Sequence, residues 1–96
     1  MRAKATAGTT SAWCKLHDDD NVAVAMKNLR KGDVLEVDGK TIQLRADIDF
    51  GHKFCIQRIA CGENVLKYGL PIGSATRDIL EGEHVHIHNI QSNYSI

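Results

Sequence analysis

The chain has 96 residues, enough for one small domain with a modest hydrophobic core. Its 12 Lys and Arg residues balance 12 Asp and Glu residues, so it lacks the net positive charge that drives non-specific binding to nucleic acid or anionic membranes. Hydrophobic residues make up 43% and charged residues 25%, as in ordinary globular proteins. We therefore expect one folded domain that binds neither nucleic acid nor a membrane.

The three cysteines form neither an even set for a disulfide framework nor a pair at zinc-knuckle spacing. They are typical of a reducing compartment. The sequence has no apolar stretch near the roughly 18 residues that span a bilayer, and its first residues lack the apolar core of a signal peptide. These features predict a cytoplasmic protein.

The first element in chain order is an expected disordered leader over residues 1–11, MRAKATAGTTS, which is small, polar and aperiodic. The domain is then expected to cover residues 12–96. AWCKLH, from residue 12, alternates as a strand does. In NVAVAM, from residue 21, Val22 and Val24 share one face of an extended segment. A short helix is the alternative there, because alanine and methionine are good helix formers; we favour a strand.

The central part of the chain gives the clearest local signal. Asp38-Gly39 separates two strand-like runs, 34–37 and 41–44, which predicts a β-hairpin. The YGLPIG segment around Pro71 indicates an irregular loop. SATRDIL, residues 74–80, is expected to form one or two short helical turns.

One phrase recurs four times along the chain: an apolar residue, two variable residues, glycine and then a polar residue. The last position is acidic in three phrases and histidine in the other. The four phrases are 29–33, 48–52, 59–63 and 79–83. We interpret the apolar residue as a core anchor and the glycine as a turn that returns the chain into a strand. The pattern predicts a mainly all-β fold of folded-over hairpins.

The EGEHVHIHN segment places His84, His86 and His88 at every second position. On a strand they would form one column, while Val85 and Ile87 would face the core. Two neighbouring histidines could share a metal, but the outer two would lie about 13 Å apart. Three interpretations therefore remain open: a solvated strand face, metal ligation, or an anion-binding or catalytic face that another polypeptide completes.

Two further segments supply candidate cations. In GHKF, glycine allows close backbone approach, and His52 with Lys53 could hold a carboxylate and move a proton. In LKYG, Lys67 could bind a carboxylate. For both lysines a solvated side chain is the simpler alternative. The three aspartates of HDDDN, residues 17–21, are interpreted as a turn rather than a metal site.

Four motifs in fixed order, LHDDDNVAVA, GHKFCI, VLKYGLPIGSAT and GEHVHIHN, resemble the small N-terminal domain of the altronate and galactarate dehydratase family. The resemblance covers residues 13–93. It implies a SAF-type β-clip fold of bent hairpins, in agreement with the all-β prediction. The family's large domain is not contained in this sequence, so the resemblance implies a small subunit, or an N-terminal module, that completes the site of a separate large dehydratase subunit.

The implied reaction is loss of water from a sugar acid, assisted by a divalent metal, iron or manganese, that this chain alone does not necessarily bind. The resemblance implies catalytic roles for His52 and His86, substrate binding by Lys53, Lys67, His84 and His88, and metal ligation by His86 and His88. The chain is expected to be inactive alone. The alternatives are the alpha subunit of a sulfolactate sulfo-lyase or a non-catalytic module that binds sugar acids, and a homo-oligomer is left open.

Overall fold

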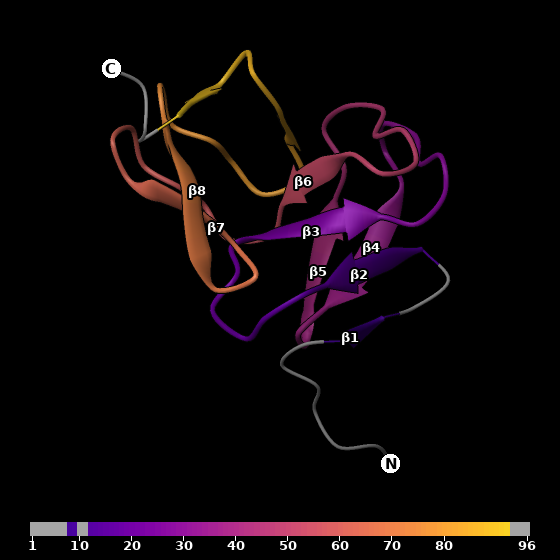
Figure 1. The fold of residues 1–96 in the computed structure, drawn as a ribbon. Helices are drawn as coiled ribbons and strands as arrows, with labels where there is room; N and C mark the ends of the chain where they lie inside the picture. Colours follow the sequence, from indigo (N-terminus) through magenta and orange to yellow (C-terminus); the bar gives the residue numbers. More distant parts are fainter. Residues whose placement is uncertain (1–7, 10–11, 93–96) are drawn as a thin grey trace.

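The computed structural model describes residues 8–9 and 12–92, and over these residues it contains ten short β-strands and no helix (Figure 1). The strands are β1 (Gly8–Thr9), β2 (Trp13–Lys15), β3 (Val22–Ala25), β4 (Val34–Val37), β5 (Lys40–Gln43), β6 (Lys53–Cys55), β7 (Asn64–Lys67), β8 (Leu70–Ala75), β9 (His84–Val85) and β10 (Ile90–Gln91). The fold is therefore all-β, as the sequence predicts, and its small antiparallel sheets are consistent with a SAF β-clip.

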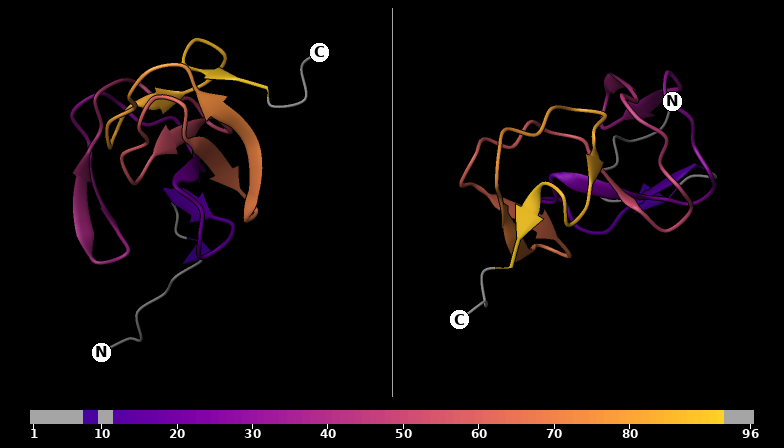
Figure 2. Two further views of the ribbon diagram at one scale, coloured as in Figure 1. Left: turned by 90° about the vertical axis from the view of Figure 1, so that its left-hand side faces the viewer. Right: turned by 90° about the horizontal axis from the view of Figure 1, so that it is seen from above.

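The strands form a five-stranded antiparallel sheet and two smaller sheets. The large sheet has the order β1-β2-β3-β6-β9, and the others have the orders β10-β8-β7 and β4-β5. Hairpin β4–β5 and hairpin β7–β8 lie on opposite sides of β2 and β3 (Figure 2, left). The large sheet is thus packed against a hairpin on each side.

Two hydrophobic clusters, rather than the single core expected from the chain length, result from this arrangement. One includes Ala23 and Phe54 with Ile42 of hairpin β4–β5. The other includes Cys55 of β6 and Val65 of hairpin β7–β8. Because successive residues of a strand point to opposite faces, β3 and β6 supply side chains to both clusters.

The predicted hairpin is present as β4–β5, with Asp38 and Gly39 both at positive φ in its turn. The loop predicted around Pro71 is wrong, because β7 and β8 form a second hairpin whose turn uses Tyr68 and Gly69, again both at positive φ. Pro71 is tolerated in β8 because the neighbouring β10 pairs only with Ser74 and Ala75. A strand position without a partner on one side needs no backbone N–H there.

Two other expectations concern local elements of the fold. The helical turns expected over 74–80 are wrong, because the segment begins as the end of β8 and ends in a bridge between Ile79 and Ile59. The strand expected at Val22 is confirmed, and the helical alternative is wrong.

Among the described residues, no helix is long and apolar enough to cross a membrane.

Part of the expected leader belongs to the sheet. Gly8 and Thr9 form β1, which pairs with Lys15 and Cys14 of β2. The expectation of a disordered leader is therefore wrong for these two residues, because an edge strand can be held by backbone hydrogen bonds that no side-chain pattern reveals. The other positions of residues 1–11 lie outside the described residues.

The repeated glycine phrase is a structural repeat. All four apolar anchors are buried, and they pair two by two in isolated bridges, Leu29 with Ile48 and Ile59 with Ile79. In each phrase the glycine N–H donates to the carbonyl of a crossing residue, and the N–H of that crossing residue donates back to the carbonyl of the residue after the glycine, at 2.8–2.9 Å. The crossing residues are Leu44, Ala25, Ala75 and Cys55. The four glycines have φ between 85° and 94°, in the region open to glycine.

Candidate functional site

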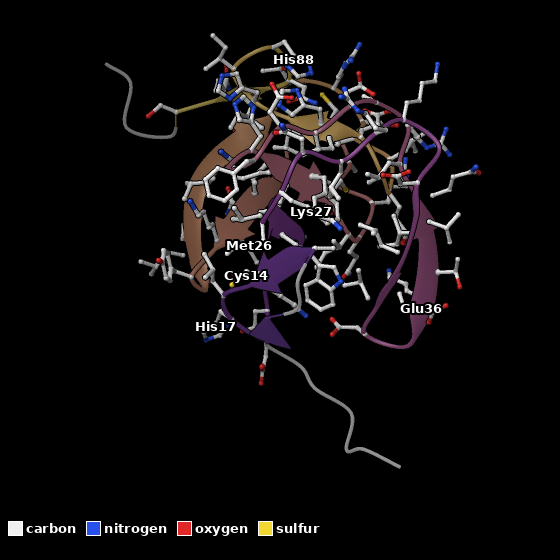
Figure 3. The ribbon with its side chains drawn as sticks, turned by 90° about the vertical axis from the view of Figure 1, so that its right-hand side faces the viewer. Cys14, His17, Met26, Lys27, Glu36 and His88 are labelled. Carbon is white, nitrogen blue, oxygen red and sulfur yellow. The ribbon has the colours of Figure 1, made fainter. Side chains whose placement is uncertain are left out.

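Four of the five histidines gather into one cluster at the start of β6 and around β9. The ring centroids of His52 and His84 are 5.1 Å apart, and those of His52 and His86 are 5.3 Å apart. The His84 ring also lies 5.5 Å from that of His86 and 5.3 Å from that of His88. We call these four residues the histidine cluster. The fifth histidine, His17, lies toward the opposite end of the molecule from His88 (Figure 3).

Strand register explains why segments far apart in sequence meet here. β6 and β9 are antiparallel, with Phe54 opposite His84. Continued by two residues, the same register places His52 opposite His86. Residues opposite each other on antiparallel strands project from the same face. His52 therefore lies on the face of His84 and His86, and its Nδ1 is 2.9 Å from Nε2 of His84.

The expected straight column of His84, His86 and His88 is wrong in its geometry. β9 ends at Val85, and the chain then turns over residues 86–89. The turn brings the His88 ring back against His84, so the expected separation of about 13 Å is replaced by 5.3 Å between ring centroids. Val85 is buried as expected, whereas Ile87 is 81% exposed and does not face the core.

A buried asparagine that the sequence interpretation did not single out stabilises this turn. Asn89 is fully buried. Its Oδ1 accepts a hydrogen bond from the His86 N–H at 2.9 Å, and its Nδ2 donates to the His84 carbonyl at 2.8 Å. Asparagine after a polar run is a signal for a turn, and that is the signal that could have indicated it.

The electrostatics of the cluster favour neutral imidazole at its centre. Partial burial lowers the pKa of His84, and the nearby His52, His88, His86 and Lys53 lower it further. The contact between His52 Nδ1 and His84 Nε2 requires one nitrogen to donate and the other to accept. A neutral, hydrogen-bonded imidazole is the form that binds metals and accepts protons.

His52, His84 and His86 can present three ligand atoms to one ion. One ring nitrogen from each lies within 4.8 Å of the other two. Within the described part of the chain, this three-residue group contains imidazoles and no carboxylate. Imidazole ligands suit zinc, copper, nickel and iron better than manganese. The structure thus groups His86 with His52 and His84, whereas the sequence pairs it with His88; ligation by His88 stays a prediction.

The two candidate lysines form a pair of their own, in which Lys53 directly follows His52 of the cluster. Lys53 opposes Val24 and Val85 in the sheet, so it projects from the face opposite His52. Partial burial and the ammonium of Lys67 lower the pKa of Lys53. Lys67 has its Nζ 5.9 Å from the ring centroid of Tyr68, a cation–π distance.

This lysine pair differs from the other partly buried lysines. Lys15 is paired with Asp38, and Lys40 with Glu81. Lys53 and Lys67 have no carboxylate partner among residues 12–92. Two half-buried ammonium groups without a counter-ion form a favourable place for an anion.

The HDDDN segment has a structural role that its interpretation as a simple turn misses. A turn is present, closed by the Asp20 N–H donating to the His17 carbonyl at 3.0 Å. The Asp20 side chain is buried, and its carboxylate accepts hydrogen bonds from the backbone N–H groups of Tyr68 and Gly69. It therefore holds the turn of hairpin β7–β8, the hairpin that carries Lys67.

Comparison of the sequence with known proteins identifies the family of the chain. The family model described as the altronate/galactarate dehydratase SAF domain matches residues 11–93. The chain belongs to this family. Altronate dehydratase of Escherichia coli (strain K12) is 52% identical over 83 residues, which are 86% of this chain and 17% of the relative. Altronate dehydratase of Bacillus subtilis (strain 168) is 42% identical over 84 residues, 88% of this chain and again 17% of the relative.

A further relative is similar in length to the SAF-family chain itself. The (2R)-sulfolactate sulfo-lyase subunit alpha of Chromohalobacter salexigens is 36% identical over an alignment of 86 residues, and the alignment covers 80% of this chain and 90% of that subunit. The relatives named here are thus dehydratases or part of a lyase. The SAF-family chain spans 17% of the length of the altronate dehydratases.

Proposed function

We propose that the chain is the small subunit or module of a sugar-acid dehydratase and completes the substrate site of a separate large catalytic subunit. The observation that carries this proposal is a cluster of four imidazoles, together with two neighbouring lysines that lack a carboxylate partner among residues 12–92, in a chain of the altronate/galactarate dehydratase SAF family. Two members of the cluster, His86 and His88, are exposed. An exposed half-site needs a second surface to exclude water and complete it.

The proposed reaction is β-elimination of water from a hydroxy-carboxylate. A base removes the proton on the carbon next to the carboxylate, hydroxide leaves from the neighbouring carbon with a proton from an acid, and the enol product tautomerises to a 2-keto-3-deoxy acid. The intermediate carries two negative charges on the former carboxylate. Cations placed against those oxygens lower the barrier, because they interact with the charge as it develops.

The residues of this chain divide between charge and proton transfer in the proposed mechanism. Lys53 and Lys67 bind the substrate carboxylate. His52 and His86 are the proton-transfer residues, since a neutral imidazole accepts and donates a proton near neutral pH. The contact with His84 fixes the orientation of the His52 ring, while His84 and His88 contribute further hydrogen bonds to the substrate hydroxyl groups.

A divalent metal fits the three clustered imidazoles. As an alternative to the metal-free roles of these histidines, His52, His84 and His86 would hold it through one nitrogen each, because these nitrogens lie close together and the lowered pKa of His84 favours the neutral ligand form. When bound, such a metal supplies a Lewis acid that stabilises the negative oxygens of the intermediate. The all-imidazole donor set favours iron over manganese.

A second candidate function is that of a sulfo-lyase alpha subunit. It is favoured by chain length, since the chain covers 90% of the sulfolactate sulfo-lyase subunit alpha. The higher identity of 52% to an altronate dehydratase favours the sugar-acid reaction. Both functions use the same histidines and lysines, and they differ in whether water or sulfite leaves.

The test is a chimera of the Escherichia coli altronate dehydratase in which the matching segment is replaced by residues 11–93 of this chain. We expect the chimera to dehydrate altronate, and the same enzyme with the segment deleted to lose activity. Adding the 96-residue chain to the deleted enzyme tests action as a separate subunit. Full activity of the deleted enzyme alone would contradict the proposal and favour a non-catalytic binding module.

Matched substitutions in the chimera identify the residues. Replacement of His52 by Gln is expected to reduce kcat strongly, whereas replacement of the remote His17 by Gln is expected to leave it unchanged. Assays with altronate, galactarate and sulfolactate separate the two candidate reactions. Equal activity of the His52 and His17 variants would remove His52 from the mechanism.

A further inference from the structure

The carboxamide of Asn89 bonds to the backbone on both sides of Val85. Oδ1 accepts from the His86 N–H at 2.9 Å and Nδ2 donates to the His84 carbonyl at 2.8 Å. The backbone of Asn89 adds a bond from its own N–H to the His86 carbonyl at 3.0 Å. One residue thus makes three hydrogen bonds to the backbone of His84 and His86, two histidines of the candidate site.

The same residue is fixed to the rest of the fold. Its side chain is fully buried, and its carbonyl accepts a hydrogen bond from the Thr76 N–H at 3.0 Å. Thr76 directly follows β8. The turn that carries the histidines is therefore anchored to the second sheet through Asn89, rather than left as a free surface loop.

These bonds convert an alternating sequence into a cluster. A continuous strand would spread His84, His86 and His88 along one edge, with neighbours roughly 6.5 to 7 Å apart. Instead the chain reverses at residues 86–89, and the rings of His84 and His88 lie 5.3 Å apart. The reversal requires a side chain of this length that both donates and accepts, which asparagine provides.

We propose that Asn89 is a positioning residue: its buried carboxamide holds His84 and His86 in the orientation in which, with His52, they act as one set of ligands. Substitution of a residue that orients metal-binding histidines through hydrogen bonds typically lowers metal affinity by about 10- to 100-fold. The inference rests on the proposed function in assigning a metal to these imidazoles. The positioning itself does not depend on that assignment.

The structure offers a matched control in Asn21. Its carboxamide also joins two backbone groups of one element, accepting from the Leu66 N–H at 2.8 Å and donating to the Asn64 carbonyl at 3.0 Å. Those bonds go to the backbone of β7, and neither involves a residue of the histidine cluster. Loss of either carboxamide removes one donor and one acceptor. Because Asn89 is fully buried and Asn21 is only half-buried, Asn21→Ser should cost less stability.

The experiment compares Asn89→Ser, Asn89→Ala and Asn21→Ser in the full 96-residue chain. The neutral substitutions add no charge beside the imidazoles, and serine retains one hydrogen-bonding group in case the alanine variant does not fold. The first readout is the NMR contact between ring protons of His52 and those of His84 and His86, without metal. The second is affinity for Co²⁺, followed by absorption and calorimetry.

We expect both Asn89 variants to lose the ring contacts and to bind Co²⁺ at least tenfold more weakly. Asn21→Ser should retain the contacts and the wild-type affinity. Unchanged contacts and affinity in folded Asn89 variants would overturn the inference, as would an equal loss in Asn21→Ser. If the wild-type chain binds no Co²⁺, the metal assignment of the proposed function fails, and the ring contacts alone decide the role of Asn89.

Discussion

Replacing Asp20 should destabilise hairpin β7–β8 out of proportion to the size of the change. The Asp20 side chain is buried, and its two carboxylate oxygens accept separate bonds, from Tyr68 N at 3.0 Å and from Gly69 N at 2.7 Å. Asp20→Asn keeps one acceptor oxygen and turns an N–H₂ group toward the other donor. One backbone N–H then loses its partner in a buried position.

The expected magnitude follows from these two bonds. A hydrogen bond to a charged group contributes about 1.5–3 kcal/mol, and a buried donor without a partner costs about 1–3 kcal/mol. We therefore expect Asp20→Asn to lower the free energy of unfolding by about 2–3 kcal/mol, and Asp20→Ala by about 3–5 kcal/mol. A domain of this size has about 5–14 kcal/mol in total, so at the lower end of this range the alanine variant approaches the limit of folding.

Urea unfolding measures the effect, and the single tryptophan reports it. Trp13 is 8% exposed and belongs to the hydrophobic cluster beside β4–β5, so its fluorescence should change on unfolding. Asp18→Asn is the matched control, because Asp18 is exposed and surface changes usually stay within about 0.5 kcal/mol. If Asp20→Asn and Asp18→Asn unfold at the same urea concentration, the proposed role of the buried carboxylate is refuted.

Three other predictions use independent measurements. Gly82→Ala should lower the melting temperature more than Gly39→Ala. Both glycines have positive φ, but only a Cβ at Gly82 would lie 2.2 Å from a backbone oxygen, that of Gln43. Equal shifts of the melting temperature would contradict this prediction. Since the pKa of His84 is lowered on folding, the unfolded chain takes up more protons there, so unfolding free energy should fall as the pH drops below about 6.5. NMR titration of His88→Gln should show a raised pKa for His84, and an unchanged value would argue against the coupling. Burial raises the pKa of Cys55 to about 12, so maleimide at pH 8 should label the exposed Cys61 and leave Cys55 unmodified until the protein is denatured.

The sequence predicted those parts of the fold whose signals are local. The Asp38-Gly39 turn and the glycine phrases were found because positive φ restricts residue choice. The hairpin at Tyr68-Gly69 was missed because Pro71 usually excludes a strand. Pro71 is accommodated because β10 does not extend along β8 as far as Pro71. How far β10 extends is a property of the whole sheet.

The candidate site was predicted in composition but not in geometry. The residues His52, His84, His86 and His88 were all named from the sequence, yet the turn that clusters them depends on hydrogen bonds of Asn89 to backbone groups. Backbone partners leave no pattern in the sequence. The proximity of His52 likewise depends on the pairing of β6 with β9, two strands about 30 residues apart.

The repeated glycine phrase also explains why position 52 can carry a histidine. In the phrases that end in Asp33 and Glu63, the acidic side chain accepts a hydrogen bond from the backbone of its own turn, at Arg30 and Ala60. The bonds to the crossing strands use backbone atoms alone, so they persist in the phrase where histidine occupies the acidic position. The four glycine turns are thus equivalent in their backbone hydrogen bonds. The last residue of a phrase can therefore differ without loss of the bonds to the crossing strand. The turn that ends in His52 lies next to β9. The one phrase without an acidic last residue is thus the phrase that supplies a histidine to the candidate site.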